Sequence, residues 1–406
     1  MKKAIFLVLI LGCAAGLFAR HYCKPAQVVS LGIDVLEANN FDILEGKRVG
    51  LITNHTGFNN MGISTIDILY GADNFELVKL FSPEHGIRGD LDTRVDSEVD
   101  EKTGLDVISL YGQTRRPQEE HLQDLDVLVF DIQGIGTRFY TYKWTMTIAM
   151  EECVKHGVEF VVLDRPNPIN GMDVQGAVAH EDVTGGFTAY FPIPTRHGMT
   201  YGELAKMSND HFGIGADLTV VAMENWERWM YYDQTGLPWK NPSPNMKTLW
   251  GALFYPGLGV GETTLISMGR GTDIPFELYG APFVDGKKLA LFMNRVSDKV
   301  GIRFIPAEFT PTAPWHDFEG QQCYGVRAIL LDREKADPVL AGLYLFQTLH
   351  FLYPDDYGFK GGFRTSSGDI YLEDKIKQGM APEDIVRTWQ RDLDEFMEVR
   401  KDYLLY

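Results

Sequence analysis

Cysteine is scarce in this chain of 406 residues, which contains four. Cys13 lies in an N-terminal hydrophobic stretch, and only Cys23, Cys153 and Cys323 lie beyond it. The number is odd and no pair has the spacing of zinc ligands, so we expect neither a disulfide framework nor a cysteine-bound zinc ion. Cys153 lies in a helix-like segment and is predicted to be a buried structural thiol.

Positive charge is also in short supply. The formal net charge is −18 and becomes −20 without Lys2 and Lys3. Such an excess of acidic residues argues against nucleic acid or an anionic membrane surface as a partner.

Long apolar runs are absent after the first 19 residues. These begin with MKK, continue as AIFLVLILG and end in small residues at Ala19, a pattern typical of a secretory signal peptide. The run is interrupted and falls short of the roughly 18 residues that a membrane span needs. The residues before Cys13 resemble a lipobox, so soluble periplasmic export and lipid anchoring through Cys13 both stay open.

Several catalytic signatures are missing as well. The chain has no GxSxG elbow and no HExxH helix, and IQGIGTRF at 132–139 lacks the third glycine of a dinucleotide fingerprint. We therefore expect no nicotinamide and no other cofactor. A metal site remains an alternative because His55, Glu84, His85, Asp131 and His197 all lie in loops that could meet.

What the first half does contain is five short hydrophobic runs, each ending in a polar loop. The runs are RVGLIT, FELVKLF, LDVISL, LDVLVFD and VEFVVLD, and helix-length segments separate them. This pattern predicts parallel strands of an α/β sheet that are buried on both faces. Ligands bind beyond the carboxyl ends of such strands, so we expect the five loops to converge on one crevice.

The loop SPEHGIRGD at 82–90 is the strongest catalytic candidate. Glu84 follows a strand directly, and a carboxyl group in a partly apolar crevice can act as a general acid near neutral pH. The alternative is that Glu84 caps a helix or pairs with Arg88. Asp131, at the end of LDVLVFD, is the predicted second carboxylate of a glycosidase-like pair, or else a structural group that holds loop amides or an arginine.

Hydrogen-bonding side chains in the other loops are candidates for substrate binding. Asn54 and His55 follow the first strand, Arg165 and Asn167 follow the fifth, and Arg165 with Arg138 would suit an anionic group. For PNPING, a rigid turn is the alternative.

A glycine- and proline-rich passage between about 170 and 200 precedes the second half of the chain. We place the domain boundary there, which gives a first domain of residues 28–185 and a second of residues 190–406. Thr200 and Glu203 form a capping box that predicts a helix. Strands are expected near 217 and 324, and helices at 338–352 and 382–400. A mixed α+β domain fits this order.

A glycine-rich segment at 255–282 brings Glu262 and Arg270 together, and its TTLISMGR stretch is predicted as a helix whose N-terminus faces the crevice. A demanding domain junction is the alternative reading of these glycines.

Eight motifs in this order resemble those of the bacterial exo-β-N-acetylmuramidases of the NamZ type, over essentially the whole mature chain. They are NHTG at 54, SPEHGIRG at 82, DIQGIGTRFYTY at 131, DRPNPING at 164, PTRHGMTYGELA at 194, NPSPNM at 241, YPGLGVGETTLISMGRGTDIPFELYGAP at 255 and GGFRTSSGD at 361.

The resemblance implies a Rossmann-like N-terminal domain, a smaller α/β C-terminal domain and a site in the cleft between them. It also implies release of terminal N-acetylmuramic acid from non-reducing ends of peptidoglycan fragments, in cell-wall turnover, with Glu84 as catalytic acid beside His85. The partner role of Asp131 and the substrate contacts of Arg138, Arg165, Arg270 and His197 are inferred from the residues alone. His85 is predicted to be catalytic together with Glu84 and Asp131, and Tyr140 and Glu262 are further candidates for binding a muropeptide or disaccharide.

Two alternatives from other classes remain: a periplasmic amino-sugar-binding module without catalysis, and a metal-dependent amide or ester hydrolase. Whether the protein forms a homodimer is left open.

Overall fold

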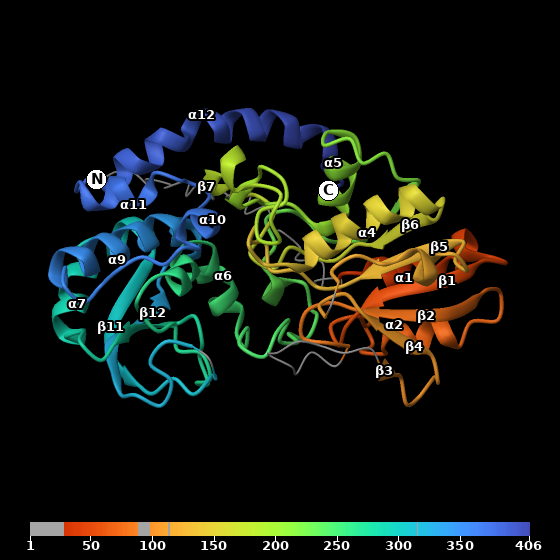
Figure 1. Ribbon diagram of the computed structural model, residues 1–406, viewed down its shortest axis with the longest axis horizontal. Coiled ribbons are helices and arrows are strands. Elements are labelled where there is room, and N and C mark those ends of the chain that lie inside the picture. Colours follow the sequence, from red (N-terminus) through yellow and green to blue (C-terminus); the bar gives the residue numbers. More distant parts are fainter. Residues whose placement is uncertain (1–27, 88–97, 113, 315) are drawn as a thin grey trace, which may run out of the picture.

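The computed structural model describes residues 28–87, 98–112, 114–314 and 316–406. The predicted signal peptide, Cys13 and Cys23 therefore lie outside the described residues. Two α/β domains lie side by side, and the long helix α12 (Pro382–Arg400) runs across both of them (Figure 1). None of the described helices combines the length and apolar composition needed to cross a bilayer.

The first domain is built on a seven-stranded sheet in the order β3-β4-β2-β1-β5-β6-β9. All neighbouring pairs are parallel except β3 with β4. The strands are β1 (Arg48–Thr53), β2 (Glu76–Ser82), β3 (Glu98–Val99), β4 (Asp106–Ser109), β5 (Val127–Asp131), β6 (Glu159–Leu163) and β9 (Leu218–Val221). The five hydrophobic runs thus form parallel strands, which confirms the predicted fold class of this half.

Both faces of the sheet are buried. Successive side chains of a strand point to opposite sides, so each strand contributes to the apolar packing on both faces. In β5, Val127 and Val129 pack in one apolar cluster, while Leu128 and Phe130 pack in another. The first cluster lies under α1 (Gly32–Ala38) and α2 (Thr65–Tyr70). The second lies under α3 (Glu119–Leu122), α4 (Tyr142–His156) and α5 (Tyr201–Asp210) and continues into the second domain.

The six parallel strands follow the spatial order 3-2-1-4-5-6 when they are counted along the chain, which is the order of a Rossmann fold. The order reverses between β1 and β5. All of these strands end at the same edge of the sheet, so their loops lie on one side of the domain.

The first domain extends beyond the boundary that we expected at 185–190. A two-stranded ribbon of β7 (Gln175–Val178) and β8 (Pro194–Arg196) precedes α5, and β9 then pairs with β6 at the sheet edge. Helix α5 begins with the predicted capping box, in which Thr200 Oγ1 accepts from Glu203 N at 3.2 Å.

The second domain contains a three-stranded antiparallel sheet in the order β10-β12-β11. The predicted strand near 324 and the helices at 338–352 and 382–400 are confirmed. The predicted helix at TTLISMGR is wrong: the helical segment lies earlier, and a 3₁₀ turn at Gly259–Thr263 ends it. The elements are α6 (Leu249–Leu258), β10 (Leu278–Ala281), α7 (Gly286–Met293), α8 (Ser297–Val300), β11 (Ile302–Phe309), β12 (Cys323–Leu330), α9 (Pro338–Leu352), α10 (Phe363–Ser367) and α11 (Leu372–Lys377).

Helices α6 and α9 approach so closely that glycine is required where they meet. A Cβ atom on Gly257 would lie 1.9 Å from the carbonyl oxygen of Pro338, and one on Gly342 would lie 2.8 Å from Gly257. The neighbouring atoms belong to the backbone and cannot move aside, so these glycines fix the spacing of the two helices.

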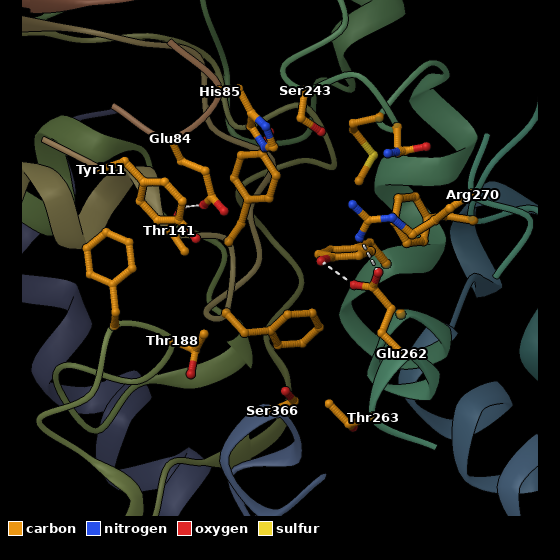
Figure 2. Close-up of a pocket in the computed structure, with 18 of the residues that line it drawn as sticks. Glu84, His85, Tyr111, Thr141, Thr188, Ser243, Glu262, Thr263, Arg270 and Ser366 are labelled. Carbon is orange, nitrogen blue, oxygen red and sulfur yellow. Dashed lines mark hydrogen bonds and ion pairs between the residues drawn. The ribbon is translucent and has the colours of Figure 1, made fainter. Parts of the chain in front are cut away.

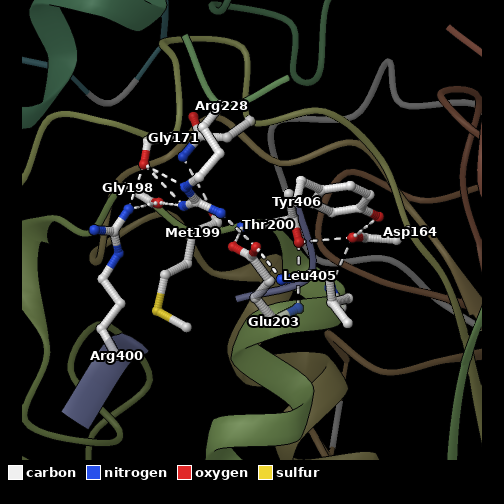
Figure 3. A network of polar contacts seen from close by, with 12 residues as sticks. Asp164, Gly171, Gly198, Met199, Thr200, Glu203, Arg228, Arg400, Leu405 and Tyr406 are labelled. Carbon is white, nitrogen blue, oxygen red and sulfur yellow. Dashed lines mark hydrogen bonds and ion pairs between the residues drawn. The ribbon is translucent and has the colours of Figure 1, made fainter. Parts of the chain in front are cut away.

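A polar network ties the end of α12 and the residues after it to the first domain (Figure 3). Arg400 Nη2 donates to the carbonyl oxygen of Gly198 at 2.7 Å, and the Tyr406 hydroxyl donates to Asp164 Oδ2 at 2.7 Å. Glu203 accepts from Leu405 N at 3.0 Å. Burial raises the pKa of Asp164 to about 6. The two domains are therefore connected through α12 as well as through the chain between β9 and α6.

Cys153 and Cys323 are free thiols and both are buried. Burial raises the pKa of both thiols, that of Cys323 to about 11. This confirms the structural placement predicted for Cys153.

Candidate active site between the two domains

A cavity of about 320 Å³ lies between the domains (Figure 2). Its walls come from loops after β2, β4 and β5, from residues 187–188, and from segments of the second domain. They comprise Glu84, His85, Tyr111, Arg115, Phe139, Tyr140, Thr141, Phe187, Thr188, Ser243, Asn245, Met246, Tyr255, Gly259, Glu262, Thr263, Arg270, Phe276 and Ser366. A volume of this size is at the small end of the range for ligand pockets, roughly 300–1,000 Å³.

Glu84 projects into the cavity from the wall formed by the first domain (Figure 2). The chain turns sharply after it, since His85 and Gly86 have φ values of 72° and 77°. Thr141 Oγ1, immediately before α4, donates a hydrogen bond to Glu84 Oε2. The carboxyl is half-buried and held in one orientation. Arg88, its alternative partner, lies outside the described residues.

Tyr111 lies beside Glu84 at the end of β4. Burial raises the pKa of the Tyr111 phenol, the carboxylate of Glu84 raises it further, and the Arg115 guanidinium lowers it. Tyr111 is therefore a neutral phenol at neutral pH, within electrostatic reach of both charged groups.

A second carboxyl, Glu262, stands on the opposite wall with Arg270 (Figure 2). Arg270 Nη1 lies 2.5 Å from Glu262 Oε1, and the Tyr255 hydroxyl donates to Oε2 at 2.9 Å. Burial, and then the charge of Glu262, raise the pKa of Tyr255 well above its usual value.

Aromatic rings line the space between these walls. The Tyr255 ring centroid lies 4.9 Å from that of Phe139 and 4.7 Å from that of Phe276. Tyr140 packs edge-on to Tyr255, at 6.3 Å, and burial raises the pKa of its phenol. The cavity thus combines apolar rings with two carboxyl groups on facing walls, which suits a sugar ring with apolar faces and polar edges.

Of the predicted site residues, the structure brings Glu84, His85, Tyr140, Glu262 and Arg270 together at the cavity. Three of the five strand-terminal loops contribute, those after β2, β4 and β5. The loops after β1 and β6 do not line the cavity. The prediction that all five loops converge on one crevice is therefore wrong for these two.

Asp131, predicted as the second catalytic carboxylate, is fully buried away from the cavity. Arg165 Nε lies 2.5 Å from Asp131 Oδ1 and Arg165 Nη2 lies 2.8 Å from Oδ2. Thr65 Oγ1 also donates to Oδ2. Both oxygens are therefore occupied by structural partners, and this pairing also accounts for the position of Arg165. The nearby charge of Asp131 raises the pKa of Arg165 against the effect of burial.

Arg138 is also buried away from the cavity wall. Its Nη1 donates to the carbonyl of Ala177 at 3.0 Å and its Nη2 to that of Ser366 at 2.7 Å. Burial lowers the pKa of its guanidinium to about 9. The side chain binds backbone carbonyls of β7 in the first domain and of α10 in the second, and so it joins the two domains.

Three further candidates from the polar loops are fully or nearly buried within the protein. His197 is 0% exposed, its Nδ1 accepts from Met199 N at 3.2 Å, and burial holds its pKa well below the usual value. Asn167 Nδ2 donates to the Met199 carbonyl at 3.1 Å. Asn54 Oδ1 accepts from Thr56 N at 2.9 Å.

His55 is closer to the surface, and its Nε2 lies 2.6 Å from the Asn241 carbonyl oxygen. It does not line the cavity. The described part of the chain contains no group of three His, Cys, Asp or Glu side chains suited to a metal ion.

The residues that sequence reasoning missed are mainly neighbours of Glu84. Thr141 lies within the FYTY segment and Ser243 within NPSPNM, so both stood in quoted motifs without an assigned role. Tyr111 marked the end of a predicted strand. Arg115 and Phe187 stand in no motif, and no sequence signal pointed to them.

Comparison with known proteins gives consistent matches over the described chain. The family model for the N-terminal domain of the exo-β-N-acetylmuramidase NamZ matches residues 49–250, and that for its C-terminal domain matches 253–406. The sequence is 43% identical to the peptidoglycan β-N-acetylmuramidase NamZ of Bacillus subtilis, over 100% of both chains.

Two solved structures of DUF1343 family proteins from Bacteroides fragilis are also similar. One superposes with a TM-score of 0.85 at 40% identity and the other with 0.75 at 32%, each covering 93% of this chain and 99% of the other. The N-terminal family model ends at residue 250 and the C-terminal one begins at residue 253, near the start of α6.

Proposed function

Because the chain belongs to the exo-β-N-acetylmuramidase family, we propose that it is a glycoside hydrolase that releases terminal N-acetylmuramic acid from the non-reducing ends of peptidoglycan fragments. The observation that carries the proposal is the half-buried carboxyl of Glu84, fixed by Thr141 at the wall of the cavity. The small volume suits one terminal sugar better than a long glycan segment.

Glu84 is the general acid in this proposal. In glycoside hydrolysis a carboxylic acid donates its proton to the glycosidic oxygen as the bond to the anomeric carbon breaks. The Thr141 hydroxyl holds one carboxyl oxygen, and the neutral Tyr111 phenol adds a polar but uncharged neighbour. His85 follows Glu84 in the same turn and also lines the cavity, so it stays the candidate for a second catalytic group next to this acid.

Glu262 is the second carboxyl of the site. Arg270 and Tyr255 hold its two oxygens in place on the wall opposite Glu84. A carboxylate in this position faces the positive charge that develops on the sugar ring in the oxocarbenium-like transition state. The acetamido oxygen of the substrate attacks the anomeric carbon as the glycosidic bond breaks and forms an oxazolinium ion. Water then opens this ring at the anomeric carbon while the Glu84 carboxylate takes up its proton. Asp131 has no part in this chemistry, because it is buried away from the cavity, where it binds Arg165 and Thr65.

The test compares Glu84→Gln with the parent on two substrates, a muramyl disaccharide and a nitrophenyl muramide. Loss of a general acid lowers turnover by about 10²–10⁴-fold when the leaving group needs a proton. The loss should therefore be large for the disaccharide and smaller for the nitrophenyl substrate, whose leaving group departs without protonation.

Glu45→Gln is the matched control, since Glu45 is exposed and does not line the cavity. Near-normal turnover of the disaccharide by a folded Glu84→Gln variant would contradict the proposal. Tight binding of N-acetylmuramic acid by a parent protein that hydrolyses neither substrate would favour the binding-module alternative. Activity abolished by chelation and restored by a divalent metal would favour the metal-dependent hydrolase.

We also propose that the protein acts outside the cytoplasm, because the first 19 residues have the pattern of an export signal and peptidoglycan fragments are met there. Mass spectrometry of the protein recovered from a bacterial host distinguishes the two expected forms. A chain beginning after Ala19 indicates soluble export, and an acylated N-terminal Cys13 indicates lipid anchoring. A chain that retains residues 1–12 contradicts both.

A further inference from the structure

Arg115 lines the cavity and lies against two neighbouring aromatic rings. Its Cζ atom lies 4.2 Å from the centroid of the Phe187 ring and 5.3 Å from that of Tyr111. The two rings are themselves 5.9 Å apart, centroid to centroid. The side chain is exposed, yet these contacts with the ring faces restrict where the guanidinium can lie.

The other cations around the cavity already have carboxylate partners. Arg270 pairs with Glu262, and Lys360, in a small adjoining pocket of about 70 Å³, pairs with Asp317. Arg116, the neighbour of Arg115 in sequence, pairs with Glu151 and Glu152.

Arg115 differs from these residues. Within the part of the chain that the structure describes, its contacts are with the rings of Tyr111 and Phe187 and with the Tyr111 phenol, and no carboxylate forms an ion pair with it. A guanidinium carries five N–H donors, so its hydrogen bond to the Tyr111 phenol leaves other donors for a ligand.

Arg115 is also close to the reacting end of the site. The Tyr111 phenol responds to both charges, since Glu84 raises its pKa and Arg115 lowers it. An anionic group bound by Arg115 would therefore lie beside the sugar whose glycosidic oxygen Glu84 protonates.

We propose that Arg115 binds the lactyl carboxylate of the terminal N-acetylmuramic acid and so determines specificity for this sugar; the inference rests on the proposed function. The free carboxylate is the group that distinguishes N-acetylmuramic acid from an uncharged amino sugar. A planar guanidinium can hold such a group by two parallel hydrogen bonds. Arg138 and Arg165, which the sequence suggested for an anionic group, are buried and occupied by other partners.

The test uses two chromogenic β-N-acetylmuramides, one with a free lactyl carboxylate and one with that carboxylate converted to its N-methylamide. The parent should have the lower KM for the charged substrate. Because hydrogen bonds between charged groups at a partly exposed site are worth about one power of ten in affinity, Arg115→Gln should raise KM for the charged substrate by about tenfold. The amide has no carboxylate for Arg115 to bind. Its KM should therefore change by less than about twofold, as expected for a substitution that removes no specific contact.

Arg115→Lys keeps the charge but not the two parallel donors, so it should recover part of the preference. Arg303→Gln is the matched control, because Arg303 is an exposed arginine that does not line the cavity. Raising the salt concentration should weaken the preference of the parent and leave that of Arg115→Gln unchanged. Thermal unfolding of each variant checks that the fold is retained.

Equal KM values for the two substrates with the parent, or an unchanged preference in Arg115→Gln, would overturn this inference while leaving the hydrolase assignment intact. A parent that cleaves neither substrate would instead overturn the proposed function, and this inference with it. In the supporting outcome, the preference for the charged substrate disappears in Arg115→Gln with kcat for the amide retained.

Discussion

The buried ion pair between Asp131 and Arg165 separates a structural role from a catalytic one. Two contacts of 2.5 and 2.8 Å join the side chains, which are 1% and 2% exposed. In Asp131→Asn the charge of Arg165 stays buried without a counter-charge, and the new amide nitrogen presents a donor where Arg165 and Thr65 need acceptors. Loss of one member of such a pair costs about 3–5 kcal/mol.

That cost is a large part of the roughly 5–15 kcal/mol by which a typical domain is stable. With a urea dependence of about 2 kcal/mol per molar, the unfolding midpoint should fall by about 2 M. Urea unfolding followed by tryptophan fluorescence and circular dichroism measures this shift. Asp298→Asn, at an exposed position, is the matched control and should change the free energy of unfolding by less than about 0.5 kcal/mol.

A second variant tests the cause of the loss. Adding Arg165→Met to Asp131→Asn removes the unpaired buried charge, so the double variant should be more stable than Asp131→Asn alone. Hydrolysis per folded molecule should stay close to that of the parent at low temperature. The reasoning is refuted if Asp131→Asn retains its unfolding midpoint but loses turnover, because Asp131 would then act in the chemistry.

Two further substitutions test the contact of the C-terminal residue with the first domain and the contact between α6 and α9 in the second domain. Burial raises the pKa of Asp164 from its ordinary value of 3.8 to about 6, so the free energy of unfolding falls as the pH rises from 3.8 through about 6. Tyr406→Phe removes a hydrogen-bond donor to this carboxyl group, and the hydrogen bond is stronger when the group is charged. Chemical unfolding should therefore show that the free energy of unfolding falls by about 1 kcal/mol at pH 5 and by about 2 kcal/mol at pH 8. Equal losses at both pH values would contradict the assignment. Gly257→Ala should destabilise the protein by about 3 kcal/mol or more in thermal unfolding, because the new Cβ atom would overlap the Pro338 carbonyl. Gly361→Ala is the control and should have little effect, because the space around Gly361 is open. Similar melting temperatures for the two variants would exclude the close contact between α6 and α9.

Much of the fold could be predicted from the sequence because local patterns determine it. The five hydrophobic runs are parallel strands since a strand covered on both faces must be apolar throughout. The capping box at Thr200 and Glu203 marked the start of α5, and the helices at 338–352 and 382–400 were placed at their observed bounds. The end of the first domain was harder to place, because β9 joins its sheet only after a long excursion through β7 and β8.

The candidate site was less predictable, because a polar residue at the end of a strand can line a cavity or can bind a structural partner inside the domain. Glu84 follows β2 and Asp131 is the last residue of β5, yet Glu84 lines the cavity and Asp131 pairs with Arg165 inside the first domain. Nothing in the local sequence distinguishes the two cases. Arg115 and Phe187 meet only through tertiary packing, over a separation that no motif spans.

The second connection between the domains constrains how the cavity can change shape. A protein with one linker between its domains has a hinge, and its domains can swing apart around it. Here the chain between β9 and α6 forms one link, and α12 with Arg400 and Tyr406 bound to the first domain forms another. Two separate connections restrict rotation of one domain against the other more than a single linker does. We therefore expect the distance between Glu84 and Glu262 to change little when a ligand binds, so that the shape of the cavity selects the ligand.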